Sequence, residues 1–199
     1  LLQFAARTLW DRRDTVNHRL RRADYEAMGG VEGALARHAD EVLHGLSHQE
    51  LQIARTLLLR LVTPESTRRV RSEHQLLDGL PAGTRPVFER LTKSRLLSIR
   101  RSSSSSDDGT RLELAHESLI RNWGLLARWI EESKEELVIL NEVSQAAELW
   151  ERRGRNEEEL WSGSGLADAR RILGRGDTEL SSLVESFLDA GHLRDQVRR

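Results

Sequence analysis

The histidine in the segment LAHESLIRNW, His116, carries the most informative chemistry in this sequence. It stands where an alternating apolar pattern gives way to a helical one, so we expect it at the amino end of a helix. Free amides and a positive field at such an end favour an anion, and an imidazole there can join them in binding a phosphate. The alternative is a histidine packed on the apolar helix face beside Trp123, with one ring nitrogen bound to backbone. Composition alone favours this alternative, because intermediate burial is normal for histidine.

Motifs for enzyme chemistry are incomplete in this chain. The sequence has no G-x-x-x-x-G-K-[ST] phosphate loop and no G-x-S-x-G nucleophile elbow. HESLI (116–120) begins like the zinc motif H-E-x-x-H, but Ile120 replaces the second histidine and excludes that site. GSGLAD (163–168) lacks the third glycine of a dinucleotide-binding loop and follows no expected strand. We therefore predict no catalytic residue and no metal ligand, and we expect that this chain alone is not an enzyme.

Composition narrows the class of protein further. Of the 199 residues, 32% are charged and 38% hydrophobic, with only three prolines, which is typical of a soluble helical protein. The absence of cysteine excludes disulfides and thiolate metal sites and suits a reducing cytosol. No apolar run approaches the roughly 20 residues that cross a bilayer. We expect a cytoplasmic protein that makes no membrane contact.

The elements that position His116 follow from the spacing of apolar residues. Steps of three and four residues predict a helix over residues 1–13 and, after a glycine pair at 29–30, another over 31–43. Ser47 is expected to begin the next helix, because its spacing to Glu50 fits a capping box.

A change of period precedes His116. A short helix around 73–80 and a helix capped by Thr84 are followed by two stretches of alternating apolar residues, 97–100 and 111–114. Period two predicts a pair of short strands, and the run Ser102–Ser106 between them is expected to form a mobile hairpin tip. Three helices followed by a β-hairpin is the order of a winged helix domain.

Helical spacing continues after His116. Residues 116–130 are expected to form one helix with a single apolar face. Ser133 and Glu136 fit the cap of the following helix, and Gly154 fits its carboxyl end. Further helices are expected near the carboxyl terminus, before a charged tail from His192.

These segments resemble the region that follows the nucleotide-binding core in bacterial STAND (NACHT/AP-ATPase-like) signalling ATPases of the novel STAND group. The resemblance covers nearly the whole chain, in the order LLQFAARTLWDRR, ADYEAMGGVEGALARHADEVL, ARTLLLRLVTP, LAHESLIRNWGLLARWIEESKEEL, AAELWERRGRNEEELW and SLVESFLDA. No single motif is decisive, but the combination is fairly specific to this group.

The resemblance implies a mainly α fold with three parts. Residues 1–45 would be a helical lid segment, 46–116 a winged helix domain with a two-stranded β-hairpin wing, and 117–199 a helical arm domain. The chain begins with Leu1 inside an apolar run rather than with Met, so we expect it to be a piece of a longer polypeptide.

The resemblance also implies a nucleotide switch. In related ATPases a Met-His-Asp motif at the end of the winged helix touches bound ADP, and Ala115, His116 and Glu117 occupy that place. The histidine is kept, so His116 would sense the nucleotide phosphate, while Met is replaced by Ala and Asp by Glu. This fragment itself would hold no cofactor, and ADP or ATP with Mg would bind the intact protein. Its partners would be its own upstream NTPase core and downstream sensor repeats, with homo-oligomers on activation.

A DNA-binding regulator is the main alternative. Residues 68–101 carry nine basic and three acidic residues, whereas 102–199 carry a net charge of −7. Winged helices often place their third helix in the major groove, where basic residues contact phosphates. The expected helix and wing supply Arg85, Arg90, Lys93, Arg95, Arg100 and Arg101. Glu89 interrupts this cluster and the long helical extension is unusual for a simple repressor, so nucleic acid is not the expected partner.

A structural adaptor whose helices only bind proteins is the third class. Nucleotide-dependent exposure of the helix face around Trp123 in the intact protein would argue against it.

Overall fold

A computed structural model describes residues 2–81, 83–101, 110–174 and 180–197 of the chain. The serine run Ser102–Ser106 lies outside these described residues. The described chain is mainly helical with one small antiparallel sheet, which confirms the expected fold class. No helix among the described residues is long and apolar enough to cross a membrane.

The amino-terminal part consists of three helices, α1 (Leu2–Asp11), α2 (Arg22–Ala27) and α3 (Gly30–His44). The helices predicted over 1–13 and 31–43 are confirmed, whereas the short α2 gave no detectable pattern. A small cluster of Ala5, Met28 and Ala34 holds the three helices together. Within α1, Ala5 is buried, whereas Leu2 and Trp10 are exposed.

The central elements of the chain fall in the segment predicted to be a winged helix domain, and we name them the winged helix unit after that prediction, which stays a prediction. They are α4 (His48–Arg60), β1 (Arg71–Ser72), α5 (Glu73–Leu77), α6 (Thr84–Lys93), β2 (Leu97–Arg101) and β3 (Thr110–Leu114). The strands form an antiparallel sheet in the order β1-β3-β2, with Leu97 opposite Leu114. The predicted hairpin is therefore confirmed but incomplete, because β1 adds a third strand beside β3. A strand of two residues is too short to show the period-two pattern that reveals a strand in sequence.

Helix caps agree only partly with the sequence pattern. Ser47 forms the predicted capping box, with its hydroxyl accepting from the Glu50 amide. Ser72 forms an equivalent box at the start of α5 that was not predicted. Thr84 is not a cap: Gly83 precedes the helix, and the Thr84 hydroxyl is buried without a partner among the described residues.

The remaining helices follow the sheet along the chain. They are α7 (Ser118–Asn122), α8 (Gly124–Glu132), α9 (Lys134–Arg152), the 3-10 turn η1 (Glu157–Glu159), α10 (Gly163–Leu173) and α11 (Ser182–Val197). The single helix predicted over 116–130 is wrong, because the backbone of Trp123 is extended between α7 and α8. Ser133 precedes α9 without capping it through its side chain, and α11 remains helical past His192.

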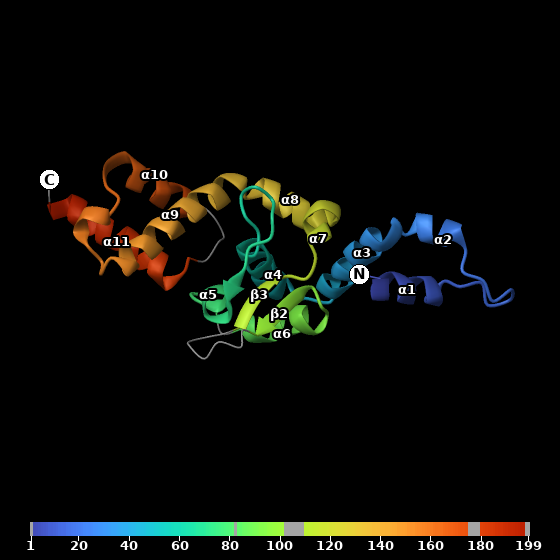
Figure 1. Cartoon of the computed structure of the whole chain (residues 1–199). Helices are drawn as coiled ribbons and strands as arrows, with labels where there is room; N and C mark the ends of the chain where they lie inside the picture. The colour runs from blue at the N-terminus through green and yellow to red at the C-terminus, as the bar shows by residue number, and fades with distance from the viewer. Residues whose placement is uncertain (1, 82, 102–109, 175–179, 198–199) are drawn as a thin grey trace.

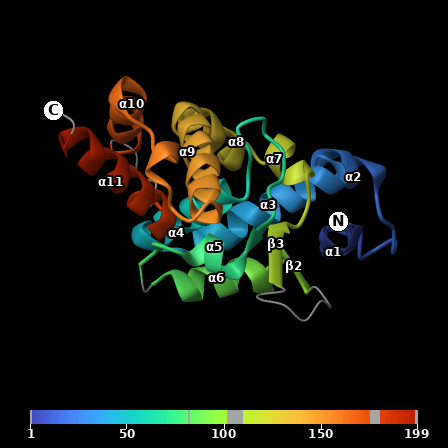
Figure 2. The ribbon, with the colours of Figure 1, turned by 60° about the vertical axis from the view of Figure 1, so that its left-hand side comes forward.

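Two large apolar clusters lie at different places along the chain. The first joins the carboxyl half of α3 to the winged helix unit, α7 and α8, and reaches Leu137 in α9. The second runs from Val143 in α9 through α10 and α11. Figures 1 and 2 show α1–α3 at one end of an elongated molecule and α10–α11 at the other. We call α8 to α11 the arm helices; the boundaries at 45 and 116 stay predictions.

Candidate functional site

His116 lies in the turn between β3 and α7, and its side chain is exposed. Its Nδ1 is 3.2 Å from the Ser118 hydroxyl, with the donor set by the ring tautomer. The expectation that His116 shares the apolar face of Trp123 is wrong. The residues from Ala115 to Glu117 are not helical, so helical spacing does not extend back to His116. Among the described residues, its Nε2 has no hydrogen-bond partner and is available to a ligand.

A network of charged side chains fixes the backbone on both sides of His116. The guanidinium of Arg68 binds Glu117 at 2.8 Å and lies 3.4 Å from Glu113. Glu113 is nearly buried and also binds Arg100 at 2.9 Å. The carboxylates of Glu113, in β3, and Glu117, adjacent to His116, are therefore engaged by arginines from other parts of the winged helix unit. Glu117 thereby anchors the turn to Arg68.

The surroundings of His116 favour the neutral form of its ring. Partial burial lowers the pKa of His116 below its ordinary value, and the positive charge of Arg68 acts in the same direction. Glu32 and Glu117 oppose these effects and raise the pKa. A neutral imidazole can still donate one hydrogen bond to a phosphate oxygen, and an arriving phosphate would favour the charged form.

The turn that carries His116 is tied to α3. The indole N–H of Trp123 donates to Asp40 Oδ1 at 2.6 Å, and the Asn122 amide donates to Glu32 at 2.9 Å. Trp123 is fully buried and meets Trp129 edge to face, with 6.3 Å between ring centroids. A shift of α3 would therefore displace α7 and the His116 turn with it.

The basic residues proposed for DNA contact are largely engaged within the protein. Arg85 pairs with Glu73 and Glu89, and Lys93 lies 3.4 Å from Glu89. Arg90 donates to the carbonyl of Gly45 at the end of α3. These contacts reduce the positive charge that α6 presents to solvent and weaken the case for a phosphate-binding face.

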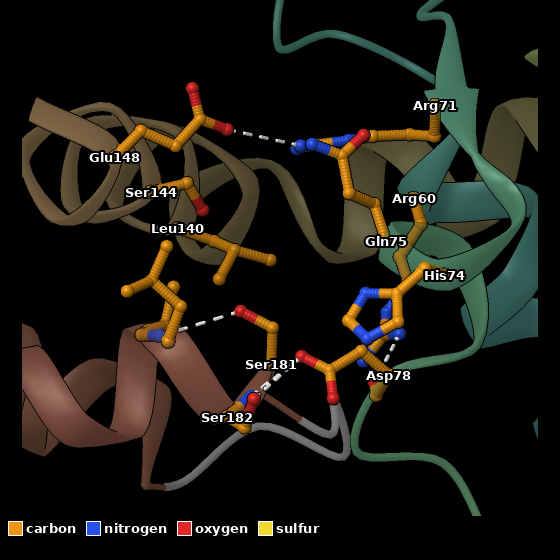
Figure 3. Close-up of a pocket in the computed structure, with 12 residues that line it drawn as sticks. Arg60, Arg71, His74, Gln75, Asp78, Leu140, Ser144, Glu148, Ser181 and Ser182 are labelled. Atoms are coloured by element: carbon orange, nitrogen blue, oxygen red, sulfur yellow. Dashed lines mark hydrogen bonds and ion pairs between the residues drawn. The ribbon is translucent and has the colours of Figure 1, made fainter. Parts of the chain in front are cut away.

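A cavity of about 180 Å³ with several charged and polar residues in its lining lies between the winged helix unit and the arm helices (Figure 3). The Asp78 carboxylate accepts from both the amide and the hydroxyl of Ser182, each at 2.9 Å, and so caps the first turn of α11. On the opposite side, Arg71 lies 3.5 Å from Glu148 in α9. These contacts connect α9 and α11 to β1 and to the end of α5.

Sequence patterns did not reveal this second contact region. Asp78 and Ser182 are 104 positions apart, and each is an ordinary polar residue in its local sequence. The one sequence feature that could have indicated this contact region is Gly79, which has a positive φ of 72° and lies against the backbone of Leu180. Among the described residues, no group of His, Cys, Asp and Glu could hold a metal ion.

Comparison with family models matches residues 1–158 to the family described as Novel STAND NTPase 1. The match covers α1 through α9 and ends within η1, so α10 and α11 lie outside it. Comparisons with curated proteins and with solved structures give no match.

Proposed function

Because the chain belongs to the novel STAND NTPase 1 family, we propose that it is a regulatory module of a signal-transduction ATPase. It holds the nucleotide-binding core in a closed ADP state and relays signals from a sensor to oligomerisation. The core and the sensor repeats are its partners within the intact cytoplasmic protein, where ADP or ATP binds with Mg. The exposed His116 imidazole, with its open Nε2, is the observation that carries the proposal.

The position of His116 suits a sensor that reads a ligand held elsewhere. A lone neutral imidazole binds phosphate weakly, so the module needs a nucleotide that the core already holds. In the closed state His116 would donate to a phosphate oxygen of ADP and add to the contacts that keep the winged helix unit docked. A nucleotide shifts the balance of states only through contacts that differ between them, and loss of this bond on exchange supplies such a difference.

The ties around His116 explain how the contact would be transmitted. Arg68 fixes the turn to the sheet through Glu117, while Trp123 fixes it to α3 through Asp40. Loss of the bond between His116 and the phosphate would therefore affect the positions of both α3 and α8. The arm helices in turn meet β1 and α5 through Arg71 and Asp78.

Replacement of His116 in the intact protein tests the proposal. We expect His116→Ala to retain less ADP after purification and to raise basal activity, because the closed state loses one phosphate contact. His44→Ala, which removes an exposed histidine at the end of α3, is the matched control and should retain ADP normally. Equal ADP occupancy in both variants and in the unmodified protein would contradict the role of His116.

A further inference from the structure

Ser118, the first residue of α7, lies two positions after the exposed His116 and is itself buried. The residue is 8% exposed, and its hydroxyl oxygen is 3.2 Å from His116 Nδ1. Among the residues that the structure describes, this is the one hydrogen bond that either side chain makes. The buried hydroxyl therefore meets one nitrogen of the imidazole, while the other nitrogen, Nε2, remains open.

The direction of this hydrogen bond follows from the groups available to it. A hydroxyl has one proton to donate and two lone pairs that accept, whereas a neutral imidazole has one donor and one acceptor nitrogen. If Nδ1 carried the ring proton, Ser118 would accept, and its own proton would lack an acceptor among the described residues. A buried donor without a partner is less tolerated than an unfilled lone pair. We therefore expect the Ser118 hydroxyl to donate to Nδ1, which places the ring proton on Nε2.

Packing and backbone hydrogen bonds hold the two residues in this arrangement. Leu119 and Ile120, which follow Ser118, are buried and belong to the first apolar cluster. The amide of Leu119 donates to the His116 carbonyl at 3.2 Å, and the amide of Ile120 donates to the Glu117 carbonyl at 3.0 Å. The Ser118 hydroxyl thus belongs to a segment of backbone that is anchored in the core and can hold the ring in one orientation.

The position of the ring proton decides what His116 can bind. Phosphate oxygens accept hydrogen bonds, so a neutral imidazole binds them only through a nitrogen that carries a proton. The neutral form is the relevant one, because burial and the charge of Arg68 lower the pKa of His116. With the proton on Nε2, the open nitrogen is a donor. With the proton on Nδ1, the open nitrogen would present a lone pair to the phosphate and repel it.

We propose that Ser118 is a positioning residue that selects the Nε2–H tautomer of His116 and so prepares its open nitrogen to donate to a phosphate oxygen. Ser118 acts through the imidazole and does not itself contact the nucleotide. A hydrogen bond to one ring nitrogen is the usual means by which proteins fix the tautomer of a functional histidine. The phosphate step rests on the proposed function of His116, whereas the tautomer can be measured on this chain without nucleotide.

Nitrogen NMR of the full chain, labelled at its histidines, tests the tautomer. The measurement is made at a pH well above the His116 midpoint, where the ring is neutral, and a spectrum of His116→Gln identifies the His116 signals. We expect Nε2–H to be the main form in the unmodified chain. Ser118→Ala should raise the ratio of Nδ1–H to Nε2–H about fivefold, as expected for the loss of one ordinary hydrogen bond. Ser118→Thr keeps the hydroxyl and should restore the original ratio.

Ser94→Ala is the matched control for the loss of a serine hydroxyl. The Ser94 hydroxyl is also partly buried, but it donates to the Leu91 carbonyl at 2.9 Å and not to a histidine ring. This variant should leave the His116 signals unchanged. A main form with the proton on Nδ1, or an unchanged ratio in Ser118→Ala, would overturn the role of Ser118.

ADP retention by the intact protein tests the phosphate step. Ser118→Ala should retain less ADP than the unmodified protein but more than His116→Ala. Because Ser118 acts only through the ring, the double variant should retain as much ADP as His116→Ala alone. A greater loss in the double variant would overturn the positioning role, since Ser118 would then act by another route. Normal retention in all three variants would overturn the proposed function and the phosphate step with it, while the tautomer is decided by NMR alone.

Discussion

The bond between Trp123 and Asp40 should stabilise the connection of α3 to the His116 turn. The indole N–H lies 2.6 Å from the Asp40 carboxylate, and the ring is fully buried. Hydrogen bonds to charged groups contribute about 1.5–3 kcal/mol, and the exposure of Asp40 places this one near the lower end. Trp123→Phe also removes buried volume, which costs about 1 kcal/mol more. We therefore expect Trp123→Phe to lower the free energy of unfolding by about 2–3 kcal/mol.

A double-mutant cycle isolates the bond from the lost volume. Asp40→Ala alone removes the acceptor but gains helix propensity in α3, so its single effect underestimates the bond. Urea unfolding of the two single variants and of the double variant should give a coupling free energy of about 1.5 kcal/mol. The control is Trp10→Phe in α1, where the side chain is 60% exposed; we expect a change below about 0.5 kcal/mol. A coupling energy indistinguishable from zero would refute the claim that this bond joins the two parts.

Two further measurements test the local structure. In an NMR titration, His116 should have a midpoint below its ordinary value of 6.5, moving lower still in Glu117→Gln and higher in Arg68→Met. At a pH between the midpoints of His116 in the folded and in the unfolded chain, the unfolded chain binds more protons than the folded one. This histidine therefore makes the free energy of unfolding rise with pH through that window. A midpoint at or above 6.5 in the folded protein would refute the assignment. Gly79→Ala should lower the free energy of unfolding by about 2 kcal/mol or more, because φ is positive and Leu180 occupies the space. Gly165→Ala, in helix α10 with open space around it, should instead raise the thermal midpoint, and equal effects would contradict the contact at Gly79.

Local sequence was sufficient for much of the fold. The capping box at Ser47 and the alternating residues of β2 and β3 depend on neighbours within a few positions, so their patterns are visible in the chain itself. The prediction from local spacing is wrong at Trp123, because the helical spacing of apolar residues continues through a residue whose backbone is extended and interrupts the helix. Tertiary contacts decide that break, because burial of the indole and its bond to Asp40 favour the extended backbone there.

The candidate site was predicted by position but not by environment. The order of strand and helix located His116 at the junction, yet its exposure and the engagement of Glu117 by Arg68 required the folded structure. Arg68 lies 49 positions before Glu117, so no local pattern links them.

Sequence by itself determined the helical class, the hairpin, the position of His116 and the resemblance to the STAND family. These depend on residue types and on spacing over one or two turns of chain. Only the tertiary structure decided which buried donors have no partner among the described residues, as Trp150 Nε1, and which distant residues meet, as Asp78 meets Ser182. Hydrogen bonding and burial depend on which residues packing brings together. Because the contacting residues are far apart in the sequence, no local pattern reveals their contact.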